Sequence, residues 1–181
     1  MKKQIRNLFI LDVLVAGLVL FVACKHRSAK PEVEATDEHG QTLMSAVHVA
    51  DPRAAVQLTK GFYDVEQNAW RWTMKQFSVV LRAPEGASKN GATLQMKFSV
   101  PNPVIDKLKA ITLSVSVNGQ ALPAETYTRP GEYILKRDVP REVFHGEAVN
   151  VDFALDKAMP PSGADLRELG IVVNTVGLEP K

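Results

Sequence analysis

Apolar and polar residues alternate strictly in two stretches near the middle of the chain, and this pattern constrains the fold more than any other feature. One stretch covers residues 94–100 and the other covers residues 111–117. Their apolar positions are Leu94, Met96, Phe98 and Val100, and Ile111, Leu113, Val115 and Val117. A period of two places successive side chains on opposite faces of a β-strand. The sequence therefore predicts strands with one buried and one solvent-facing side.

Turn-forming residues delimit these two strands. Pro101 and Pro103 follow the first stretch and block continuation of a ladder, because proline has no amide hydrogen. Asn118-Gly119 follows the second stretch and is the favoured pair for a two-residue type I′ hairpin. Further strands are expected at residues 56–58, 70–72, 77–81, 133–139, 149–155 and 171–178.

The strands point to one fold class. No amphipathic helix is expected between them, and turn signals recur at regular spacing. This organisation predicts an all-β domain over residues 54–181, with two antiparallel sheets packed face to face in a jelly-roll-like β-sandwich. The domain contains no cysteine, so its stability has to come from packing without disulfides.

The first 24 residues predict export from the cytoplasm. A basic N-terminus precedes a sixteen-residue apolar run, residues 8–23, and Cys24 follows that run. A basic segment, an apolar segment and small residues before a cleavage point are the parts of a secretory signal.

Two alternatives remain for this leader. Its end resembles a bacterial lipobox, in which Cys24 becomes lipidated and N-terminal, although Phe21 and Lys25 depart from that motif. The other alternative is an uncleaved signal anchor. Sixteen residues at ~1.5 Å each give about 24 Å, short of the ~30 Å hydrocarbon layer unless flanking Lys and Arg side chains reach its surface. Both alternatives attach the domain to a membrane on the extracytoplasmic side.

Residues 25–53 are expected to form a flexible tether, because they are poor in aromatic residues and mixed in charge. Within them, the run 44–49 is left open as a helical turn or as unstructured. The chain carries a net charge of +2, and its first twelve residues supply +3 − 1 = +2. Everything from residue 13 onward is therefore neutral, which argues against a nucleic-acid partner.

Two separated motifs resemble those of a known class of domains. Residues 61–73 read GFYDVEQNAWRWT, and residues 165–170 read DLRELG directly before a final strand. Their order is similar to that in jelly-roll β-sandwich domains, similar to carbohydrate-binding modules, that occur in bacterial envelope proteins and beside glycosyltransferases. The resemblance covers about residues 58–178. It implies a β-sandwich in an envelope setting, with sugar binding as an analogy.

The first motif contains the candidate ligand contacts. Trp70 and Trp72 lie two apart on a predicted strand and project to the same face. Their rings either stack on a sugar or lie in the core, where tryptophan is commonly buried. Tyr63, Glu66 and Asn68 complete this part of the candidate site.

Charged residues near these contacts have two alternative roles. Arg167 either braces its loop through a carboxylate or backbone carbonyls, with Asp165 close by, or binds ligand. Arg71 projects opposite to the tryptophans and is a candidate partner for Glu66 or Asp64.

The sequence contains few residues that indicate catalysis. The domain has a single histidine, His145, and neither a G-x-S-x-G elbow nor a cysteine. Asp64, Glu66 and Asn68 offer oxygen ligands for a structural calcium ion, but the spacing lacks the glycine of an EF-hand loop. We expect no enzymatic activity, no cofactor and no metal; a hydrolase would need two carboxylates that converge in a cleft.

The sequence leads to one functional hypothesis and one alternative. The hypothesis is a membrane-anchored, extracytoplasmic, non-catalytic module that binds a glycan or another envelope protein. The alternative is a structural or assembly lipoprotein with protein partners only. The exposure of Phe62, Tyr63, Trp70 and Trp72 is the observation expected to discriminate between them.

Overall fold

A computed structural model describes residues 42–181 of the chain. The apolar leader, Cys24 and the first part of the expected tether lie outside the described residues. Between residues 42 and 181, no helix is long and apolar enough to span a bilayer.

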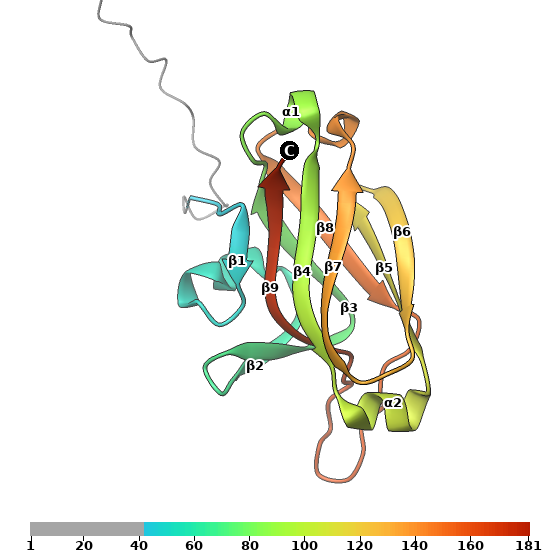
Figure 1. Cartoon of the computed structure of the whole chain (residues 1–181). Coiled ribbons are helices and arrows are strands. Elements are labelled where there is room, and N and C mark those ends of the chain that lie inside the picture. Colours follow the sequence, from blue (N-terminus) through green and yellow to red (C-terminus); the bar gives the residue numbers. More distant parts are fainter. Residues whose placement is uncertain (1–41) are drawn as a thin grey trace, which may run out of the picture. The chain divides into compact units, whose positions relative to one another are not determined.

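Nine β-strands make up almost all of the regular structure between residues 42 and 181 (Figure 1). They are β1 Ala46–His48, β2 Lys60–Glu66, β3 Trp70–Arg82, β4 Ala92–Val100, β5 Ile111–Val117, β6 Gln120–Tyr127, β7 Gly131–Val139, β8 Ala148–Leu155 and β9 Val172–Pro180. The connections contain the short helices α1 Ala87–Asn90 and α2 Asn102–Leu108, and the 3₁₀ turns η1 Pro52–Gln57 and η2 Arg141–Val143. The predicted all-β fold is confirmed, although no helix was expected between the strands.

The strands form one antiparallel path that folds into two layers. The order is β6-β5-β8-β3-β9-β4-β7, with β1 beside β9 and β2 beside β3. The long strand β3 belongs to both layers: Trp72 pairs with Val172 of β9, whereas residues 76–82 pair with β8. The predicted sandwich is therefore correct, and its two sheets are joined through β3.

The two ends of this path, β6 and β7, are bridged by a side chain. Arg137 of β7 donates from Nε to the carbonyl oxygen of Pro123 at 2.6 Å. Its Nη2 forms an ion pair with Glu125 of β6 at 2.7 Å. The sandwich is thus nearly closed into a barrel, which protects edges that would otherwise be open to other strands.

The core lies between the layers and is formed by the alternating apolar positions. All eight apolar side chains of the stretches 94–100 and 111–117 are buried, as predicted. The rings of Phe77 and Phe153 stack with centroids 4.8 Å apart. Asn118 and Gly119 have φ values of 46° and 83°, as the predicted type I′ turn requires.

The segment before β2 differs from the prediction. Residues 56–58 were expected to form a strand, but η1 ends at Gln57 and Val56 is 37% exposed. The 3₁₀ turn η1 begins at Pro52 for two reasons. The Asp51 carboxylate accepts a hydrogen bond from the Arg53 amide at 2.9 Å, and the proline ring fixes φ at a value that suits the first position of a helix.

The run 44–49, which the sequence left open, contains β1. Gln57 holds this run against β3 through its buried side chain, which is 1% exposed. Its Oε1 accepts from the Met44 amide at 3.0 Å, and its Nε2 donates to the carbonyls of Met44 and Val80 at 2.9 and 2.7 Å. The folded part of the chain therefore includes residues that precede the expected boundary at residue 54.

Candidate functional site

Two segments that are far apart in sequence meet at one end of the sandwich. One is the hairpin of β2 and β3, and the other is residues 156–170, which lead into β9 (Figure 1). Isolated bridges from Met159 to Leu169 and from Ser162 to Asp165 shape the second segment. These two segments carry the two sequence motifs, so the fold brings the motifs together.

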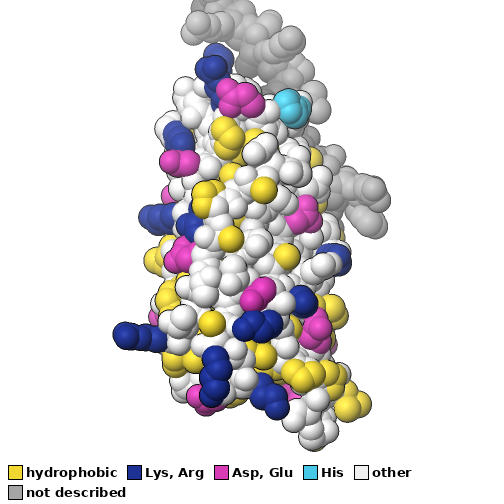
Figure 2. Space-filling view, turned by 90° about the vertical axis from the view of Figure 1, so that its right-hand side faces the viewer, with side chains coloured by type: hydrophobic (Ala, Val, Ile, Leu, Met, Phe, Trp, Pro, Cys, Tyr) yellow, Lys and Arg dark blue, Asp and Glu magenta, His cyan; other side chains and the backbone are white. Residues whose placement is uncertain are grey.

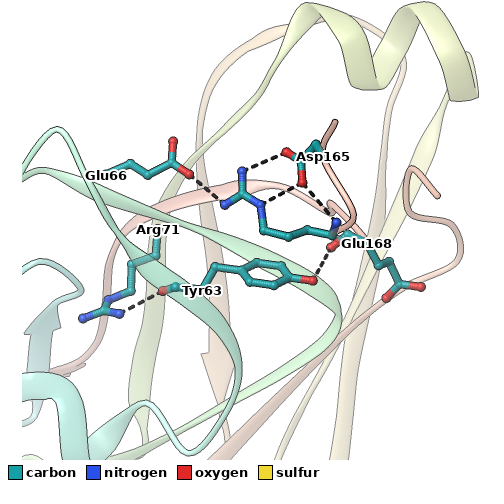
Figure 3. Close-up of polar contacts among 6 residues, drawn as sticks. Tyr63, Glu66, Arg71, Asp165 and Glu168 are labelled. Atoms are coloured by element: carbon teal, nitrogen blue, oxygen red, sulfur yellow. Dashed lines mark hydrogen bonds and ion pairs between the residues drawn. The ribbon is translucent and has the colours of Figure 1, made fainter. Parts of the chain in front are cut away.

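Arg167 is the centre of the polar contacts between the motifs (Figure 3). Its Nε and Nη2 donate to the two oxygens of Asp165 at 3.0 and 2.9 Å. Its Nη1 donates to Glu66 of β2 at 2.8 Å, across 101 positions of sequence. The predicted bracing of Arg167 by a carboxylate is thus observed, and a second carboxylate adds to it.

These contacts fix the charge state of the pair. Hydrogen bonds from the Arg167 side chain and backbone hold the pKa of Asp165 below its usual value. The hydrogen bonds to Asp165 and Glu66 raise the pKa of Arg167 further above neutrality. Asp165 is therefore a carboxylate and Arg167 a cation at pH 7.

Tyr63 and Glu168 form a second link between the same segments. The Tyr63 hydroxyl donates to the Glu168 carbonyl at 2.9 Å, and the Arg167 guanidinium carbon lies 5.2 Å from the centre of the Tyr63 ring. The Glu168 carboxylate accepts from the Lys75 amide of β3 at 2.9 Å. The segment 156–170 is thus held to both strands of the hairpin.

A bend in β3 makes room for this segment. The pairing of β2 with β3 shifts between Lys60↔Ser78 and Phe62↔Thr73, which leaves extra residues on β3. Gly61 has φ +72° and approaches the Gln76 carbonyl so closely that a Cβ would lie 2.0 Å from it. Glycine is required there by both its φ and the close approach.

Gly170 has a comparable role at the end of the second motif. A Cβ at this position would lie 2.7 Å from both Leu155 Cδ1 and Thr73 Oγ1. Its amide donates to the Thr73 carbonyl at 2.7 Å, and the buried Thr73 hydroxyl accepts from the Ile171 amide at 3.2 Å. The DLRELG motif thus ends in the glycine that lets β9 begin against β3.

Trp70 and Trp72 are half-buried, between the two outcomes that the sequence left open. Their rings meet edge to face with centroids 6.4 Å apart. Trp72 packs against the core. Trp70 lies opposite Glu66 in the hairpin, so the side chains of Trp70 and Glu66 share a face. The exposed part of the pair therefore lies on the Glu66 side of the hairpin.

The remaining candidates of the first motif lie away from Arg167. Asn68 is exposed in the hairpin turn with φ 53°. Arg71 donates to the carbonyls of Val49 and Tyr63 at 2.7 and 2.8 Å, so these backbone groups hold it in place of either candidate partner, Glu66 or Asp64. Glu66 pairs with Arg167 instead, and no group of acidic, histidine or cysteine side chains in residues 42–181 is arranged to hold a metal.

A cavity of about 330 Å³ opens beside Arg167. Pro103, Met159 and Leu169 provide apolar walls. The polar lining comes from Lys107, Ser162, Asp165 and Arg167. Helix α2 supplies Pro103 and Lys107. No local pattern in the sequence indicates that this helix lies beside the second motif.

Comparisons with known proteins find only distant structural likeness. No protein-family model and no curated protein sequence matches the chain. The structure is distantly similar to the CBM36-1 domain of a multidomain xylanase from the hindgut metagenome of Trinervitermes trinervoides, with 11% identity, 75% of this chain and 96% of that chain covered, and a TM-score of 0.40.

Two further solved structures have a similar degree of likeness. A family 35 carbohydrate-binding module from Clostridium thermocellum is 12% identical over 75% of this chain and 98% of that chain, with a TM-score of 0.40. A structure of the CBM51-2 domain, in complex with GlcNAc, and INT domains from Clostridium perfringens ZmpB is 13% identical over 80% of this chain and 36% of that chain, with a TM-score of 0.38.

Proposed function

We propose that the domain is a non-catalytic module that binds a glycan in the cavity beside Arg167. The observation that carries the proposal is the combination of apolar walls and fixed charges in one cavity of about 330 Å³. Ligand pockets commonly pair apolar walls with a few well-placed polar groups. A sugar ring presents both C–H faces and hydroxyl groups, so it matches such a lining.

The charged groups are suited to hydroxyl recognition. Contacts with Asp165 and Glu66 use three of the five N–H groups of Arg167, so its remaining donors are available to a ligand. Those contacts also fix the guanidinium in place, so little side-chain entropy is lost when a ligand binds. The half-buried ring of Trp70 lies opposite Glu66, outside the cavity lining, so it offers an additional apolar surface to a glycan that extends past Glu66.

The same contacts favour binding over hydrolysis. Asp165 and Glu66 converge, but both are paired with one guanidinium, which offsets one of their two negative charges. A glycoside hydrolase needs one carboxylic acid that stays protonated near neutral pH. The pKa of Asp165 is lowered rather than raised, so it does not provide that acid.

The test is a glycan array with the fragment 33–181, which contains the whole compact unit and keeps β1. Arg167→Ala is expected to lower the affinity for a glycan that binds the parent by about tenfold or more, because a charged hydrogen-bonding group is lost. Trp70→Ala should weaken the binding of a glycan that extends from the cavity past Glu66. Proper folding of each variant is checked by its thermal unfolding.

Arg53→Ala is the matched control. Arg53 forms the same local pair with Asp51 that Arg167 forms with Asp165, but its side chain is 81% exposed and does not line the cavity. Loss of glycan binding in both arginine variants, or in neither, would contradict the assignment of the site.

One observation favours the second candidate function, a module that binds only protein partners. Leu166 is 81% exposed, between Asp165 and Arg167. A large exposed apolar side chain next to a cavity is a suitable anchor for another protein. A Leu166→Ser variant that keeps glycan binding but loses an envelope partner recovered by cross-linking would support this second function.

The proposal places the domain on the extracytoplasmic side of a membrane. This part is supported by the leader sequence, in which an apolar run precedes Cys24. If Cys24 carries the lipid, Cys24→Ala or globomycin treatment will change the electrophoretic mobility of the protein and its membrane retention. Unchanged behaviour in both experiments would favour the signal anchor instead.

A further inference from the structure

A second hollow lies on the outer face of the layer formed by β6, β5, β8 and the second half of β3. The strand register aligns one residue from each of five strands in a row across this face. Lys60 pairs with Ser78, Ser78 with Asp152, Asp152 with Ser116, and Ser116 with Ala121. Neighbouring strands are ~4.8 Å apart, so the row spans about 19 Å.

The hollow exists because the residues in its middle are small. A parallel row is formed by Gln76, Ala154 and Ser114. Serine and alanine leave a depression of about 300 Å³ between the longer side chains Lys60, Gln76 and Asp152. On the inner side of the same two strands, β3 and β8, the rings of Phe77 and Phe153 stack in the core.

The hollow offers hydrogen-bonding groups of both kinds. Ser78 donates to one oxygen of Asp152 at 2.6 Å, and Lys60 donates to Gln76 at 3.0 Å. Within residues 42–181, the hydroxyls of Ser114 and Ser116 have no hydrogen-bond partner. Two hydroxyls, an ammonium and a carboxylate therefore line one continuous trough.

We propose that this trough is a second ligand site, which binds an extended, uncharged polyhydroxylated chain, that is, a neutral oligosaccharide several units long. Lys60 and Asp152 balance each other, so a neutral ligand matches the trough. The strand backbones beneath it are already paired within the sheet, so a ligand bonds to the side chains.

Other occupants match the trough less well. A peptide that crosses the strands would leave its backbone amides without the paired ladder that an exposed sheet edge provides. A nucleic acid needs several cations, and the trough has one. Figure 2 shows the side of the domain on the right of Figure 1, where positive and negative side chains are interspersed without an extended patch of either sign.

The absence of aromatic rings from the outward side chains of the trough has a consequence. Each sugar unit gains only a few hydrogen bonds that compete with water, which are individually weak. Affinity therefore depends on how many units lie along the row. A hexasaccharide should bind at least about tenfold more tightly than its monosaccharide, in contrast to the compact cavity beside Arg167.

The test is an NMR titration of the ¹⁵N-labelled fragment 33–181 with cellohexaose, xylohexaose and maltohexaose, and with glucose and xylose. At least one hexasaccharide is expected to shift the amide signals of Ser78, Ser116 and Asp152. Ser116→Leu fills the hollow from the outer face and should weaken this binding by about tenfold or more. Ser99→Leu, on the outer side of β4 in the other layer, is the matched control and should leave it unchanged.

The outcomes separate this site from the cavity. Changes in the amide signals of Ser78, Ser116 and Asp152 that persist in Arg167→Ala support the second site, whether or not the cavity binds sugar. Shifts confined to residues 63–72 and 159–169 support the cavity and overturn the second site. No shift with any hexasaccharide at millimolar concentration, or binding that survives Ser116→Leu, also overturns it.

Discussion

Two pairs of the form Asp-x-Arg show that a local motif does not make a site by itself. In Asp51-Pro52-Arg53 and in Asp165-Leu166-Arg167 the guanidinium holds the carboxylate two residues before it. Only Arg167 also meets Glu66 and the ring of Tyr63. Sequence reasoning predicts the local pair, because the partners are adjacent. It does not predict Glu66, because that contact depends on how the hairpin is placed.

The Asp165–Arg167 pair predicts a pH-dependent contribution to stability. The folded-state pKa of Asp165 lies below its unfolded value of ~3.9, so the contribution is fully present above that value and is lost as the pH falls through the lower folded pKa. We expect the difference in free energy of unfolding between the parent and Asp165→Asn to be larger at pH 7 than at pH 2.5.

Urea denaturation at both pH values measures this difference, with Arg167 left intact. The free energy of unfolding of Glu66→Gln at pH 7 reports whether the Glu66 carboxylate stabilises the fold in addition to Asp165. A parent–variant difference that stays the same at pH 2.5 would show that the stabilisation does not come from the ionised carboxylate.

Gly170 predicts a steric effect at a single residue. A Cβ there meets Leu155 and Thr73 at 2.7 Å inside packed structure, so Gly170→Ala should lower the free energy of unfolding by about 1–3 kcal/mol. Gly146→Ala is the control, since nothing lies within 4 Å of a Cβ at that position. Equal denaturation midpoints for the two variants would contradict the close approach of β9 to β3.

At the scale of elements, the bend in β3 explains why its full length was not predicted. Residues 70–72 and 77–81 alternate as strands should, and both were expected to be strands. Between them Met74, Lys75 and Gln76 are all exposed, so the period of two is interrupted. The interruption marks the point at which β3 passes from one layer to the other, and a single sequence does not distinguish such a bend from a loop.

The edge formed by β1 and η1 depends on a buried polar side chain. Replacing Gln57 with Ala removes three hydrogen bonds and leaves the Met44 and Val80 groups without this partner, so we expect a loss of about 1–3 kcal/mol in the free energy of unfolding. Amide exchange of Met44 should accelerate. Gln120→Ala, at an exposed position of β6, should change neither quantity.

This edge also shows a limit of pattern analysis. The prediction placed a strand at residues 56–58 because Val56 and Leu58 alternate with Gln57. In the structure the polar residue is buried and Val56 is exposed. Gln57 faces inward because it donates hydrogen bonds to backbone carbonyls 13 and 23 positions away. No local pattern in the sequence indicates these distant partners.

At the scale of the whole domain, the alternating stretches predicted the core correctly, because burial of one sheet face imposes the same period on every strand. Phe98→Ala should therefore lower the free energy of unfolding by about 3–5 kcal/mol, through lost burial and the cavity that remains. Lys97→Ala, on the outer face of the same strand, should change it by less than about 0.5 kcal/mol. Similar melting of both variants would contradict the facing of β4.

The direction of β9 has a practical consequence for handling this protein. β1 runs antiparallel to β9, with Ala46 opposite Gly177, so the chain enters the domain beside Lys181. Arg167 lies before the opposite end of β9, and nine strand residues span about 30 Å. A bead, sensor chip or fluorescent reporter joined ahead of Thr42 or behind Lys181 would thus be held on the far side of the sandwich from the cavity, leaving its mouth open to large soluble polymers.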